Sequence, residues 1–108
     1  MPIERRRSKR HPFQAMAEIT DESENSRTAS RITDLSIHGC YVEMSNPFPP
    51  GRSVLIEIFT DDEFVEAHAT VAYLHPREGM GLEFTDLPAH FASVLHRWVH
   101  QAAHAKPN

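Results

Sequence analysis

The sequence predicts a single all-β domain, in which six antiparallel strands form a small barrel or sandwich and one α-helix follows. Six short segments, about ten residues apart, are predicted to be strands, and most of them alternate apolar with polar side chains as half-buried strands do. After the sixth segment the apolar residues recur with the period of an α-helix. The length of 108 residues corresponds to one domain with a modest core.

The first three strands are separated by polar segments. Residues 13–20 alternate regularly, and the polar loop at 21–27 separates them from the second strand at 28–33. That strand runs into a turn at 34–39, which leads directly into the third strand at 40–44.

A loop rich in Pro and Gly precedes the fourth strand, residues 54–58. The fifth strand, 65–73, is long, and its alternation places Tyr73 on the same face as the apolar residues before it. A turn at 76–79 leads into the sixth strand, 80–84.

The helix is predicted from Pro88 to Ala103, with Asp86 as its cap and Pro88 in its first turn. Trp98 is its largest apolar anchor, and we expect the helix to plug one end of the sheet or cover an open edge. One face carries the apolar residues Phe91, Val94, Leu95, Trp98, Val99 and Ala102.

Charge divides the chain into a basic N-terminal arm and an acidic body. The first ten residues have a net charge of +4, and the remainder has −8. We therefore interpret 1–12 as a mobile arm, 13–103 as the folded domain and 104–108 as a tail. The arm favours an anionic partner, whereas the acidic body disfavours nucleic acid.

Composition also predicts the compartment. The single cysteine, Cys40, forms no internal disulfide and shares a face with Val42, so we expect a buried thiol in a reducing compartment. The first 30 residues lack the apolar run of a signal peptide. Apolar stretches are shorter than the ~20 residues that span a bilayer. We expect a soluble, cytoplasmic protein without membrane insertion.

Two motifs carry the candidate chemistry. Arg6 and Arg10 form an RxxxR just before the first strand, and Asp34, Ser36 and Gly39 form a DxSxxG turn. Each has an ordinary alternative. The arm can be a solvated tail, and the turn can be plain turn chemistry, with Asp34 and Ser36 bonding backbone amides and Gly39 at positive φ.

Taken together and in this order, the motifs resemble the PilZ domain, a bacterial receptor for the second messenger cyclic di-GMP. The resemblance covers nearly the whole chain and includes the Pro-rich loop closing on Gly51 and the GLEF segment at 81–84. It implies a six-stranded antiparallel PilZ-type β-barrel with a C-terminal helix. It also implies that cyclic di-GMP is bound by Arg6, Arg10, Asp34, Ser36 and Gly39.

These residue types suit that ligand. An Arg fork pairs with phosphate, donates to guanine O6 and N7, or stacks on the base. A carboxylate such as Asp34 accepts from guanine N1–H and N2–H₂, a donor pair that adenine lacks. Within the family, an arginine at the position of Arg5 is associated with two stacked ligands, which gives the sixth binding residue. Ligand would order the arm and present a changed surface to an unknown downstream protein.

Other functions fit the residues less well. No nucleophile motif or P-loop is present, so we expect no enzyme and no cofactor. The stripe of His96, His100 and His104 is interpreted as a polar helix face rather than a metal site. The alternative within the family is an interaction adaptor that does not bind cyclic di-GMP. The apolar helix face leaves a homodimer open.

Overall fold

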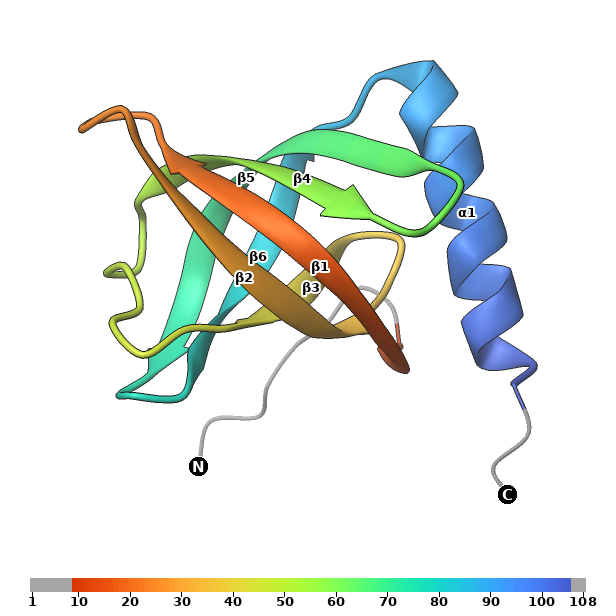
Figure 1. The fold of residues 1–108 in the computed structure, drawn as a ribbon, viewed down its shortest axis with the longest axis horizontal. Helices are drawn as coiled ribbons and strands as arrows, with labels where there is room; N and C mark the ends of the chain where they lie inside the picture. Colours follow the sequence, from red (N-terminus) through yellow and green to blue (C-terminus); the bar gives the residue numbers. More distant parts are fainter. Residues whose placement is uncertain (1–8, 106–108) are drawn as a thin grey trace.

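The six predicted strands pair into a closed antiparallel barrel with one helix at its end (Figure 1). The structure is a computed structural model that describes residues 9–105. Around the barrel the strands follow the order β1-β2-β3-β6-β5-β4. The elements are β1 (His11–Asp21), β2 (Ser26–Leu35), β3 (Gly39–Glu43), β4 (Ser53–Phe59), β5 (Phe64–His75), β6 (Gly79–Asp86) and α1 (Ala89–Ala103).

The alternating pattern points one side of each strand into the barrel. Ile19, Ile32, Val42 and Ile56 are fully buried, and Cys40 lies among them as its position in β3 predicts. The predicted all-β fold is therefore confirmed as a barrel rather than a sandwich. The strands extend one or two residues beyond most of the predicted bounds, because pairing continues into polar segments that show no alternation.

The predicted start of the helix is wrong. Asp86 is the last residue of β6, and no side chain caps α1. Pro88 occupies the N-cap position with φ −55° and ψ 147°, outside the first turn. Its carbonyl accepts from the amides of Phe91 and Ala92 at 3.0 and 2.9 Å, which satisfies two of the free N–H groups at the helix start.

Packing against β5 and β1 holds α1 at one end of the barrel (Figure 1). Leu95 and Trp98 are buried, and the Trp98 ring stacks on Phe13 at a centroid distance of 5.5 Å. Since the barrel is closed, the helix covers its end rather than an open edge. Within residues 9–105, no helix combines the length and the apolar character that a membrane crossing requires.

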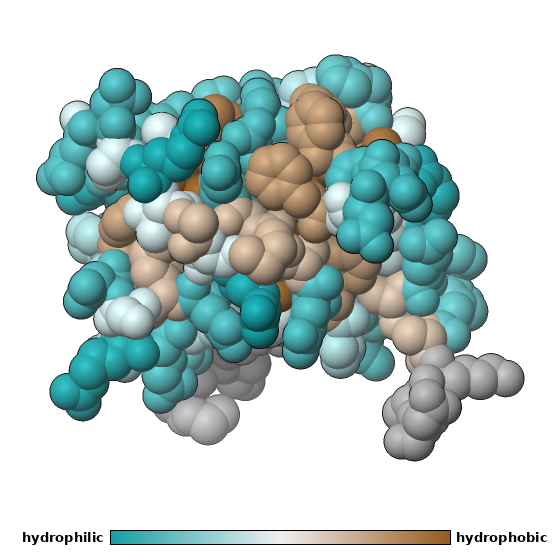
Figure 2. Space-filling model, viewed as in Figure 1, coloured by the Kyte–Doolittle hydropathy of each residue, from teal (hydrophilic) through white to brown (hydrophobic). Residues whose placement is uncertain are grey.

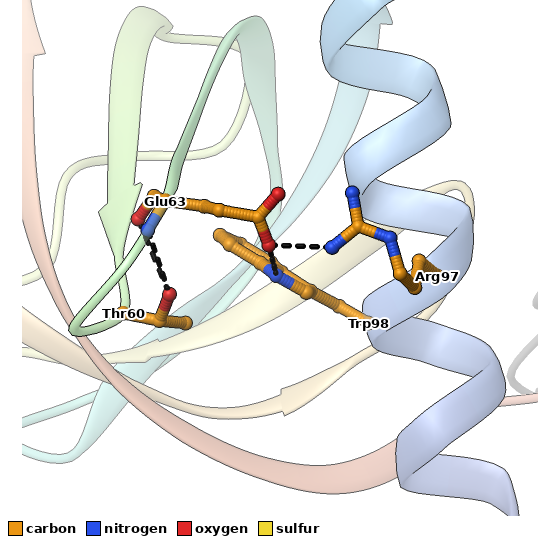
Figure 3. A network of polar contacts seen from close by, with 4 residues as sticks. All are labelled: Thr60, Glu63, Arg97 and Trp98. Atoms are coloured by element: carbon orange, nitrogen blue, oxygen red, sulfur yellow. Dashed lines mark hydrogen bonds and ion pairs between the residues drawn. The ribbon is translucent and has the colours of Figure 1, made fainter.

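A polar network ties the same helix to the β4–β5 turn (Figure 3). The Glu63 carboxylate accepts from Arg97 at 2.5 Å and from the indole N–H of Trp98 at 3.3 Å. The turn itself is closed by Thr60, whose amide donates to the Glu63 carbonyl at 2.9 Å. The hydrogen bond from Arg97 lowers the pKa of Glu63.

This network makes the helix docking sensitive to acid. Because the pKa of Glu63 lies below its ordinary 4.5, the pair stabilises the fold above that pH and loses its effect as pH falls through the lowered value. Glu63→Gln should slightly lower the Tm near neutral pH, and its difference from wild type should shrink on acidification. Thermal melts followed by circular dichroism test this. Glu24→Gln, on the β1–β2 turn, is the matched control and should leave the Tm unchanged; a pH-independent effect of Glu63→Gln would contradict the assignment.

Candidate functional site

Two β-bulges turn polar side chains onto one outer face of the barrel. In β2 the register shifts between Ile32 and Asp34, which places Asp34 opposite Tyr41 on the outside. In β5 the register shifts between Val71 and Tyr73. Tyr73 therefore faces outward, and its predicted place on the apolar face is wrong because the extra residue of a bulge reverses the alternation.

The bulges align a row of cross-strand neighbours, here called the ligand row. It consists of Pro12, Asp34, Tyr41, Gly81 and Tyr73, one residue from each of β1, β2, β3, β6 and β5. A Cβ atom at Gly81 would lie 2.4 Å from the Tyr73 ring, so the ring rests directly on the glycine backbone. Only glycine allows this close approach.

Arg10, the second arginine of the RxxxR, reaches the far end of this row. Its guanidinium donates to the Tyr73 hydroxyl at 2.6 Å and lies 5.7 Å from the centre of the ring. Arg10 stands two residues before Pro12, which pairs with Asp34, so the guanidinium leaves β1 on the side where Asp34 lies. Burial raises the pKa of the Cys40 thiol to about 12, so it is an inert part of the core.

Ser36 and Gly39 shape the turn between β2 and β3. The Ser36 hydroxyl accepts from the amides of His38 and Gly39, both at 3.1 Å, and Ser36 is almost fully buried. Gly39 does not take the expected positive φ; among the described glycines Gly51 does, at 93°. Glycine is needed at 39 because a Cβ there would lie 2.1 Å from the Leu82 carbonyl oxygen.

Asp34 differs from Ser36 in the hydrogen bonding of its side chain. Its Oδ1 is buried and has no hydrogen-bond partner there. The buried carboxylate of Asp21 provides the contrast, because it accepts from the amide and hydroxyl of Ser23 and forms an ion pair with Arg52. Leaving a buried acceptor without a hydrogen bond costs free energy. Asp34 is therefore a candidate for binding a donor from outside the barrel.

Aromatic rings beside Asp34 were missed by the motif analysis. Tyr41, Tyr73 and His75 form a cluster with ring centroids 5.4 to 6.4 Å apart. Burial, and then the nearby Glu78 carboxylate, raise the pKa of Tyr41, whose hydroxyl shares a 3.0 Å hydrogen bond with His75 Nδ1. The sequence signal was weak, since no fixed spacing links residues on β3 and β5.

A groove of about 420 Å³ opens beside this cluster. It lies between the Thr33 bulge of β2 and the β5–β6 turn, where Arg77 and Glu78 line it, and Tyr41 forms part of its wall. The ligand row is therefore bordered by a concave surface as well as by aromatic rings.

Arg5 and Arg6, the other predicted arginines, lie outside the described residues. The structure thus brings together Arg10 and Asp34, with Ser36 and Gly39 in the supporting turn. The histidine stripe on α1 forms local contacts instead, since His104 Nδ1 lies 2.8 Å from the His100 carbonyl oxygen. Among residues 9–105, no three His, Cys, Asp or Glu side chains are grouped to hold a metal ion.

Comparison with known proteins identifies the family. The model of the PilZ domain matches residues 4–101, and the chain belongs to the PilZ domain family. The match spans both motifs, the barrel and nearly all of α1. No curated protein sequence matches the chain.

Solved structures have the same fold. The PilZ domain of YcgR from Escherichia coli, solved with c-di-GMP, has a TM-score of 0.74 and 17% identity over 93% of this chain and 92% of that one. The PilZ domain of CeSA from a cellulose-synthesizing bacterium gives 0.69 and 23%, over 90% and 100%. The Bacillus subtilis inhibitor of motility (MotI/DgrA) gives 0.72 and 20%, over 92% of this chain but 51% of its own.

The buried, unpaired Oδ1 of Asp34 predicts that this carboxylate does not contribute to the stability of the free protein. Asp34→Asn should leave the Tm of the free protein unchanged or raise it, because it removes the charge of a carboxylate whose buried Oδ1 has no hydrogen-bond partner among residues 9–105. Asp21→Asn is the matched control and should lower the Tm, because it breaks the pair with Arg52. Thermal melts compare the two; an equal loss of stability would show that Asp34 is a structural residue.

Proposed function

We propose that this PilZ domain is a receptor for cyclic di-GMP, bound over the ligand row. The observation that carries the proposal is the buried, unpaired Oδ1 of Asp34 at the edge of an exposed aromatic and arginine surface. A structural carboxylate would be paired, as Asp21 is. In this proposal the ligand supplies the hydrogen-bond partner that Oδ1 of Asp34 lacks among the described residues.

Guanine provides the matching donors. Its N1–H and N2–H₂ groups lie side by side on the Watson–Crick edge, and the two oxygens of one carboxylate accept from both. Adenine has no such pair, so this contact selects guanine. The hydrogen bonds involve a charged acceptor and form where water is partly excluded, which makes them stronger than neutral bonds in solution.

Arg10 and Tyr73 supply the neighbouring contacts. Tyr73 holds the Arg10 guanidinium by a hydrogen bond of 2.6 Å, so the fork is oriented before ligand arrives. An oriented guanidinium pairs with a phosphate or with guanine O6 and N7. The Tyr73 ring, half-buried on Gly81, offers a flat apolar surface for a base.

Arg5 and Arg6 complete the cationic side of the site. In this proposal ligand draws the segment that carries them against the ligand row, where they neutralise phosphate charge. Ser36 and Gly39 contribute by fixing the turn that presents Asp34, so that backbone comes close to the ligand. The rearranged surface then signals to a downstream protein.

An adaptor that binds no nucleotide is the alternative. It is consistent with the fold alone, but it gives no reason for an unpaired carboxylate oxygen in a buried position. Absence of heat and of thermal stabilisation on adding cyclic di-GMP to the wild-type chain would favour the adaptor.

Titration calorimetry with cyclic di-GMP tests the receptor. Arg6→Ala and Asp34→Ala should abolish measurable binding, and Tyr73→Ala should weaken it roughly ten- to a hundredfold, the range expected for loss of one base stack. Wild type should bind cyclic di-GMP in strong preference to cyclic di-AMP, because only guanine satisfies Asp34. Arg31→Ala removes an exposed arginine of β2 and is the control, which should bind like wild type. Unchanged affinity in Asp34→Ala would overturn the site.

The same titration measures the role of Arg5. Two stacked ligands bring four phosphate charges, so Arg5 would be required for the second molecule. Wild type should then bind two ligands per chain and Arg5→Ala one. Equal stoichiometry in both proteins would show that Arg5 does not recruit a second ligand.

A further inference from the structure

The face of the barrel formed by β1, β4 and β5 carries a second ordered surface, distinct from the ligand row. Outward residues of these strands stand in register, which places them in rows across the sheet. The ligand row centres on β2, β3 and β6 instead. The two surfaces share the strands β1 and β5. On β5, Phe64 and Tyr73 lie toward opposite ends, about 30 Å apart at the usual rise per residue.

One row is apolar and is here called the aromatic row. Met16 pairs with Phe59 and Phe59 with Phe64, and the Phe64 ring lies 5.3 Å from Phe91 at the start of α1. Met16 is 55% exposed and Phe64 45%, the two most exposed large apolar residues among those described. Figure 2 shows apolar surface gathered over β1 and β4 and continuing toward the β4–β5 turn.

The next row along the same strands is acidic. Glu18 pairs with Glu57 and Glu57 with Glu66, so three carboxylates stand side by side next to the aromatic row. Like charges directly opposite each other destabilise a sheet. Arg27 lies 3.5 Å from Glu18 and offsets one end of the row. Burial, and then the neighbouring Glu66 carboxylate, raise the pKa of Glu57.

From this juxtaposition we infer that the aromatic and acidic rows dock a basic, amphipathic segment of another protein, with its apolar side chains on Phe59 and Phe64 and its Lys or Arg side chains on Glu57 and Glu66. Apolar contact supplies the area, and the cations relieve the repulsion between the carboxylates. Aromatic and Met side chains are typical of interface centres. This docking goes beyond cyclic di-GMP binding and does not depend on it.

Charge selects this occupant over the others. Three aligned carboxylates repel an anionic bilayer and nucleic acid. A second copy in a two-fold interface would add a second acidic row to the same contact, since such an interface presents the same patch from both sides, and would double its negative charge. A cationic segment with one apolar face is attracted by the carboxylates and also covers the aromatic row.

A model helical peptide tests the surface with the full-length chain. The probe is a fluorescein-labelled synthetic peptide with leucines on one helix face and lysines on the other, and fluorescence anisotropy measures its Kd. Phe64→Ser should raise the Kd about tenfold or more, as for an aromatic interface anchor. Glu57→Gln/Glu66→Gln should also raise it and flatten its dependence on salt. Met16→Ser provides a second apolar variant, and melting curves establish that each variant is folded.

Matched controls separate this docking from general charge attraction. Glu24→Gln/Glu78→Gln removes two charges away from the two rows and should leave the Kd unchanged, as should Ile37→Ser, which removes an exposed apolar residue elsewhere. The inference is overturned if these controls weaken binding equally, or if a leucine–glutamate peptide binds as well. It is also overturned if Phe64→Ser abolishes a wild-type dimer in sedimentation, or abolishes binding to phosphatidylglycerol vesicles. Because these readouts use no nucleotide, failure of the receptor proposal would leave them interpretable.

Discussion

The site depends on two β-bulges, because regular strands would not place its side chains together. Without the extra residue in β2, Asp34 would not stand opposite Tyr41 on the outer face. Without the one in β5, Tyr73 would point into the core beside Val71. Bulges interrupt pairing and weaken a ladder locally. The closed barrel tolerates them because the surrounding strands are paired on both sides.

Close packing then converts this placement into a fixed geometry. The Tyr73 ring rests on the Gly81 backbone, and its hydroxyl holds Arg10, so an arginine next to the first strand is aimed along the row. The Ser36 hydroxyl closes the neighbouring turn. These groups have their hydrogen bonds within the barrel, whereas Oδ1 of Asp34 has no partner in the part of the chain that the structure describes. The cost of one unpaired acceptor is thus confined to the position where a guanine would meet it.

Much of this could be predicted from the sequence, for physical reasons that also explain the failures. Period-two alternation predicted most of the strands, because most inward positions of a small barrel are apolar; the buried Asp21 of β1 is an exception. The helical period predicted Trp98 as an anchor, and the structure buries it. A bulge, however, leaves no mark in an alternating pattern, so Tyr73 was assigned to the wrong face. Asp86 was predicted to cap the helix because the sequence pattern ends the sixth strand at residue 84, whereas β6 continues to Asp86.

Mapping amide chemical shifts by NMR during titration with cyclic di-GMP tests the central claim most directly. If the bulged strands present one ligand row, the largest shifts will cluster at residues 34–41 and 73–81, two segments far apart in sequence. The chemical shifts of the amides around Phe59 and Phe64, on the opposite side of the barrel, will not change. Shifts confined to the first ten residues, or centred on β4, would contradict the account.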